Sequence, residues 1–112
     1  MNINQTVSGF FTPYDYERIT VSTSAVGFTA AKLNPMGDDL QRNLRKARLI
    51  LVTVETDTIR YTIHGVNPVA TSLGHLGRVG DVLSFANWQA MKNFRAIREG
   101  GADGHLSVTY LR

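Results

Sequence analysis

The chain contains no cysteine among its 112 residues. This excludes a disulfide framework, a zinc ribbon, an iron–sulfur centre and a thiol nucleophile. Long apolar runs are also missing: the longest, residues 49–52, has four residues, whereas a membrane-spanning helix needs about 18. No basic and apolar leader is visible at residues 1–11. We therefore expect synthesis in a cytoplasm and no membrane partner.

Amphipathic helical patterns are scarce, and short alternating or apolar segments recur about every ten residues instead. The expected strands cover residues 18–22, 48–55, 58–64, 81–85, 93–99 and 105–112, while residues 87–93 fit one helical turn or a wide loop. This spacing predicts an all-β fold, a single antiparallel β-sandwich of immunoglobulin-like or jelly-roll-like type, over residues 17–112.

Two strand segments carry more detailed expectations. Residues 48–55 are apolar on both faces, which predicts a central strand covered on both sides. In residues 58–64, alternation places Ile59, Tyr61 and Ile63 on the inner face and His64 on the solvent face. Gly100, Gly101 and Gly104 predict a hairpin connection before the last strand.

Residues 1–16 predict an extended N-terminal arm that is rich in aromatic side chains. Phe10, Phe11, Tyr14 and Tyr16 fall within seven residues. This is too much apolar surface to leave in water, so we expect the arm to cover an edge of the core or a neighbouring subunit.

Residues 65–81 form a long connection between two expected strands, and none of its features indicates a chemical site. Gly74, Gly77 and Gly80 lack the spacing of a dinucleotide fingerprint and the Gly-Lys-Ser/Thr of a P-loop, so turn glycines are expected. The three histidines lie far apart in sequence, and no Gly-x-Ser-x-Gly elbow is present. The aspartates, among them the adjacent Asp38 and Asp39, fall in expected turns, and nothing marks two of them as a catalytic pair. We expect no catalytic residues, no metal and no cofactor.

The densest positive cluster lies at residues 42–48. Arg42, Arg45, Lys46 and Arg48 could contact phosphates or an acidic protein surface, or could form a solvated loop. The net charge of +3 is otherwise spread thinly along the chain. Nucleic acid is therefore not expected as the partner.

The stretch TIRYTIHGVNPVAT at residues 58–71 resembles a hairpin of small bacteriophage virion proteins. The stretches GHLGRVGDVLSF, NFRAIREGG and HLSVTYLR continue the similarity, as does the opening FFTPYDYERITVSTSAVGFTAAKLNP. A related motif occurs in immunoglobulin-like modules appended to chitobiase-type glycosidases. The resemblance implies a non-enzymatic structural protein of the virion, as a capsid decoration (cement) subunit or a head–tail or tail accessory.

Such a subunit would bind copies of itself, as a homo-oligomer, and other virion proteins such as the major capsid or tail proteins. The long connection could plug the open end of the sandwich or reach into a neighbour through Leu73 and Leu76. The expected interface residues are Phe10, Phe11, Tyr14, Leu73, Leu76 and Trp88. The alternative is a carbohydrate-binding module for host attachment, with Trp88 and Tyr61 as stacking platforms.

Overall fold

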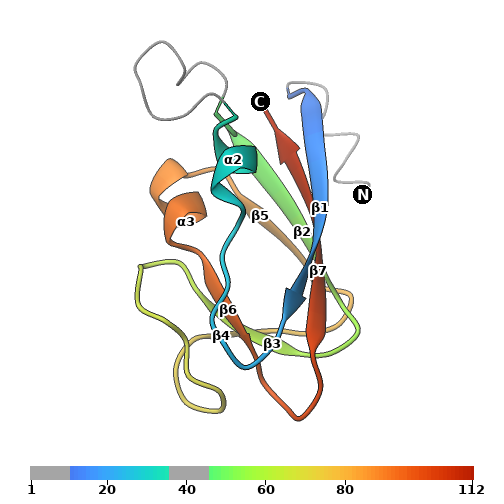
Figure 1. The fold of residues 1–112 in the computed structure, drawn as a ribbon, viewed down its shortest axis with the longest axis vertical. Coiled ribbons are helices and arrows are strands. Elements are labelled where there is room, and N and C mark those ends of the chain that lie inside the picture. Colours follow the sequence, from blue (N-terminus) through green and yellow to red (C-terminus); the bar gives the residue numbers. More distant parts are fainter. Residues whose placement is uncertain (1–10, 36–45) are drawn as a thin grey trace.

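The computed structural model describes residues 11–35 and 46–112 as two antiparallel sheets packed face to face (Figure 1). The four-stranded sheet has the order β1-β7-β2-β5, and the three-stranded sheet has the order β4-β3-β6. The strands are β1 (Pro13–Val21), β2 (Leu49–Glu55), β3 (Ile59–Thr62), β4 (His75–Gly77), β5 (Val82–Phe85), β6 (Arg95–Arg98) and β7 (Gly104–Leu111). The predicted all-β sandwich is confirmed.

Two short helices lie near each other at one end of the sandwich (Figure 1). Helix α2 (Ala30–Leu33) follows a segment in which Val26 forms an isolated bridge to Ala96. Helix α3 (Trp88–Asn93) is the single helical turn that residues 87–93 allowed. The Asn87 side chain caps it by accepting a hydrogen bond from the Ala90 N–H at 3.1 Å.

The space between the sheets is filled largely by aromatic rings. Phe28 stacks on Phe94 at a centroid distance of 4.4 Å, and Phe85 packs against both rings. Tyr110 meets the edge of Phe28 at 6.2 Å and donates its hydroxyl proton to Glu17. Burial first, and then the Glu17 carboxylate, raise the pKa of Tyr110. Alternate residues of β2 and β7 complete this core.

Strand β1 begins at Pro13, so the last four residues of the expected arm belong to the sheet. The main chains of Thr12 and Arg112 exchange two hydrogen bonds, which start the pairing of β1 with β7. Tyr14 then packs against Tyr110 and donates its hydroxyl proton to the Lys32 carbonyl at 2.6 Å. Burial raises the pKa of Tyr14 to about 12. This side chain covers an edge of its own core.

Two other expectations from the sequence are wrong. The glycine-containing segment after β6 is not a hairpin, because β6 and β7 belong to different sheets and the chain crosses between them. Strand β2 is central, between β7 and β5, but the second sheet covers only one of its faces. On the outer face Leu49 is buried at the start of the strand, but Leu51 is only half-buried, beside the exposed Ser84.

Candidate interaction surface

The exposed apolar side chains of the protein are concentrated in one stretch of the chain. Among the described residues, eight large hydrophobic side chains are exposed, and all but Tyr16 lie between residues 63 and 82. We call this stretch the 63–82 segment, and its exposed members are Ile63, Val66, Val69, Leu73, Leu76, Val79 and Val82. Single exposed apolar residues are ordinary, but a concentration of them indicates an interaction surface.

The exposure within the 63–82 segment is substantial. Val79 is 57% exposed, and Val69 and Val82 are each 52% exposed. Ile63 was expected to face inward but is 40% exposed, because β3 ends at Thr62. The Thr62 hydroxyl donates to the Val66 carbonyl, which turns the chain and buries Thr62 in place of Ile63.

An ion pair beneath the 63–82 segment fixes its middle part. Arg60 on β3 forms a two-pronged ion pair with Glu99, with N···O distances of 3.0 Å and 2.6 Å. The Arg60 guanidinium also donates to the Gly74 carbonyl at 2.9 Å, and Glu99 accepts the Thr71 N–H at 2.6 Å. The Arg60 guanidinium, followed by the Thr71 N–H, lowers the pKa of Glu99 to about 2.

Gly74 allows this arrangement because no side chain would fit there. Its φ is +125°, and a Cβ atom would lie 2.8 Å from the Arg60 Cγ and 2.9 Å from the Tyr61 carbonyl oxygen. Next to it, Val69 and Leu73 form a bridge with main-chain bonds of 2.9 Å. The 63–82 segment is therefore held by ionic and main-chain contacts, while seven of its large apolar side chains remain exposed.

The glycine series has two structural roles. Gly74 and Gly80 have positive φ values, as turn glycines do, whereas Gly77 lies on β4, buried against Ile59 and Val54. A strand follows each of Gly74 and Gly80, so neither meets the helix N-terminus that a phosphate cradle requires.

A shallow pocket of about 390 Å³ opens beside the segment. It is lined by Thr62, Ile63, His64, Leu73, Gly74 and His75. Leu73 is thus brought next to Ile63, while Leu76 lies on β4 opposite Arg60. His64 is exposed, as predicted, and His75 packs near the Tyr61 ring at 5.5 Å. Within residues 11–35 and 46–112, no three histidine or carboxylate side chains gather as a metal site would require.

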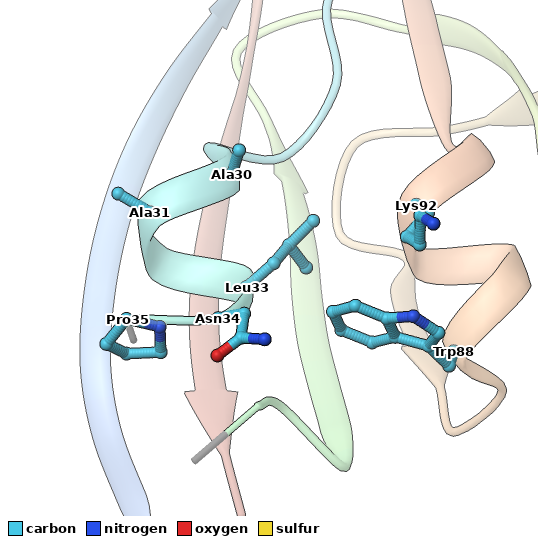
Figure 2. A pocket seen from close by; sticks show the side chains of 7 residues that line it. All are labelled: Ala30, Ala31, Leu33, Asn34, Pro35, Trp88 and Lys92. Atoms are coloured by element: carbon cyan, nitrogen blue, oxygen red, sulfur yellow. The ribbon is translucent and has the colours of Figure 1, made fainter. Parts of the chain in front are cut away.

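Trp88 lies elsewhere, in the wall of a second pocket of about 360 Å³ near α2 and α3. Figure 2 shows its indole ring directed towards Leu33 and Asn34, with Lys92 on the same helix. The Lys46 and Lys92 ammonium groups lie 4.8 Å and 6.0 Å from the centre of the ring. Trp88 is half-buried and does not adjoin the 63–82 segment in sequence.

The remaining predicted contact residues are dispersed or lie outside the described residues. The Arg48 guanidinium stacks over the half-buried Phe11 ring at 5.1 Å, and Lys46 contacts Trp88 instead. The two described members of the basic cluster thus have different aromatic partners. Phe10, Arg42 and Arg45 lie outside the described residues.

Comparisons with protein-family models, with curated proteins and with solved structures gave no match. Neither helix in the described ranges is long and apolar enough to cross a bilayer.

Sequence reasoning found Leu73 and Leu76 but missed most members of the exposed set. Val66 and Val69 fall in the long connection, and Val82 falls in an expected strand. Their spacing is irregular, so no periodicity distinguishes them from buried residues. Their density was the available signal, since 63–82 contains seven large aliphatic residues in a chain region with few predicted core positions.

Proposed function

We propose that this chain is a non-enzymatic structural subunit of a bacteriophage particle. It would act as a capsid decoration (cement) protein or a head–tail or tail accessory, and it would stabilise the particle through repeated protein–protein contacts. The observation that carries the proposal is the exposed apolar 63–82 segment, which the Arg60–Glu99 pair holds in place. The resemblance to small bacteriophage virion proteins suggests that the particle is a virion.

Repetition would make weak contacts of this surface effective. Covering a surface with several half-exposed aliphatic side chains lowers the free energy by roughly 25 cal/mol for each Å² of apolar area removed from water. A single small contact of this kind is weak after the cost of association is subtracted. Many copies that bind one particle together convert weak contacts into stable coverage.

The test is co-sedimentation of the purified protein with particles of the phage that encodes it. We expect binding by the natural protein and strong loss of binding when Val69 and Val79 are both replaced by lysine, because charges would enter the apolar surface. A matched control replaces Thr20 and Thr23, which are exposed on the β1 side of the molecule, by lysine. The proposal fails if the natural protein does not sediment with particles. It also fails if the two double variants lose binding equally.

A carbohydrate-binding module is the second candidate, and the Trp88 pocket is the observation that favours it. Tyr61 does not serve as a second platform, because its ring packs against Phe85 and Phe94 in the core. A glycan array would decide: binding that disappears in Trp88→Ala supports the module. The absence of binding, or binding that Trp88→Ala leaves unchanged, rejects it.

A further inference from the structure

The four-stranded sheet has two edge strands, β1 and β5, and they differ in their residues and regularity. An edge strand presents unpaired N–H and C=O groups that can pair with a strand of another molecule. Proteins that remain monomeric block their edges with charges, proline or β-bulges. The two edges of this sheet can therefore be compared for such features.

The β1 edge carries all three protective features. Strand β1 begins with Pro13, has a bulge between Pro13 and Asp15, and contains the charged side chains of Asp15, Glu17 and Arg18. The Asp15 carboxylate accepts the Tyr16 N–H at 2.8 Å, so this outward main-chain group is already satisfied. The Asp15 carboxylate also pairs with Lys32 at 3.0 Å.

The β5 edge carries none of them. Residues 82–85, Val-Leu-Ser-Phe, contain no proline and no charge, and their pairing with β2 is continuous. Among the described residues, no other strand pairs with β5. Val82 and Ser84 are exposed, and Val79 and Val82 of the apolar 63–82 segment lie at the start of this edge.

The hydrogen-bonding pattern shows which main-chain groups face the open side. Val54 donates its N–H to the Asp81 carbonyl at 3.0 Å. In an antiparallel ladder only every second pair exchanges hydrogen bonds, so Val52–Leu83 and Ile50–Phe85 are the bonded pairs of β2 and β5. The N–H and C=O groups of Val82 and Ser84 therefore point away from the sheet.

We propose that a second copy of this chain pairs with the β5 edge, so that two β5 strands run antiparallel about a two-fold axis at Leu83. In this register Val82 of one copy exchanges main-chain hydrogen bonds with Ser84 of the other, and Leu83 faces Leu83. Along this contact, which we call the seam, Asp81 of one copy lies opposite Phe85 of the other, so the two Asp81 carboxylates do not face each other. A two-fold contact uses the same surface on both copies, and the seam is self-complementary in this way.

This inference rests on the proposed assembly role and names the contact between copies. The first test is the mass of the purified chain in solution, by sedimentation velocity and native mass spectrometry over a range of concentrations. We expect a dimer of two 12.4 kDa chains. Ser84→Pro should shift the protein to monomer, because proline removes the outward N–H but is tolerated at an edge position that does not pair inward. The matched control, Thr20→Pro at an outward position of β1, should remain a dimer.

A second test keeps the proposal falsifiable if a proline variant fails to fold. Directly opposed residues of a pair without mutual hydrogen bonds have Cα atoms about 4.5 Å apart, within the range of about 4.4–6.8 Å that a disulfide spans. Because the chain has no cysteine, Leu83→Cys should form a covalent dimer on mild oxidation. Ala86→Cys, three residues further along and exposed, should not.

The outcomes separate the seam from the proposed function. A monomeric natural protein overturns the seam, as does a dimer that Ser84→Pro leaves intact or equal cross-linking at both cysteine positions. If the seam fails while the protein still binds phage particles, the proposed function stands without it. If the dimer forms as described but never binds particles, the seam stands and the proposed function fails.

Discussion

The β1–β7 half of the four-stranded sheet and the 63–82 segment are built in opposite ways. Strands β1 and β7 pair along their whole length, and their inner side chains, such as Val21, Leu106 and Val108, are fully buried. The 63–82 segment has one three-residue strand, is held by polar contacts, and leaves most of its aliphatic side chains in water. The first region buries its apolar side chains within the protein, and the second leaves them exposed.

The largest expected effect lies in the aromatic core between the two sheets. Phe94 is fully buried and lies against Phe28, Phe85 and Tyr61. Phe94→Ala should lower the free energy of unfolding by about 3–5 kcal/mol, because it removes buried area and leaves a cavity. Val79→Ala in the 63–82 segment should change it by less than about 0.5 kcal/mol. Urea unfolding measures both, and similar losses would contradict the contrast between buried core and free surface.

A smaller loss of stability should follow from a substitution at Gly74, where the 63–82 segment contacts Arg60 and Tyr61. Gly74→Ala should destabilise by about 1–3 kcal/mol, since its backbone conformation and its contacts with Arg60 and Tyr61 leave no room for a methyl group. Gly100→Ala is the matched control: its φ lies outside the strained positive range and nothing lies near its Cβ position, so its effect should stay within about 0.5 kcal/mol. Equal thermal unfolding midpoints for the two variants would show that the segment is not held at Gly74.

The Glu99 carboxylate should make a pH-dependent contribution to the free energy of unfolding, and this contribution should be smaller still. Its pKa is lowered from 4.5 to about 2 in the folded chain, chiefly by Arg60. The unfolded chain therefore binds the proton first, and the contribution is complete above pH 4.5 and is lost as the pH falls towards 2. Glu99→Gln should flatten the fall in stability across this window. An unchanged pH profile in Glu99→Gln would mean that Arg60 does not stabilise the carboxylate.

The sequence predicted the sandwich because β2, β3 and β7 alternate or are apolar over their full lengths, and such patterns depend on local chemistry. It did not predict which strands share a sheet. The segment between β6 and β7 has the glycines of a hairpin, but Gly104 instead packs so closely against Ile59 and Asp57 that a Cβ atom would not fit. That contact joins residues far apart in the chain, which no local pattern reports.

The interaction surface was predictable only in part. Leu73 and Leu76 were predicted as contact residues because they lie in a long connection that could cover the end of the sandwich or a neighbour. Ile63 was assigned to the core because the alternation of β3 continues past the point where the Thr62 hydroxyl turns the chain. The open edge at β5 depends on the order of strands in the sheet, and strand order is a property of the whole fold.

The most direct test of the proposed role compares amide hydrogen exchange in the free and the particle-bound protein. We predict slower exchange in peptides that cover the 63–82 segment and β5 when the protein is bound, with little change in peptides from β1. Unchanged exchange in the 63–82 segment on bound particles, or protection confined to β1, would contradict the account.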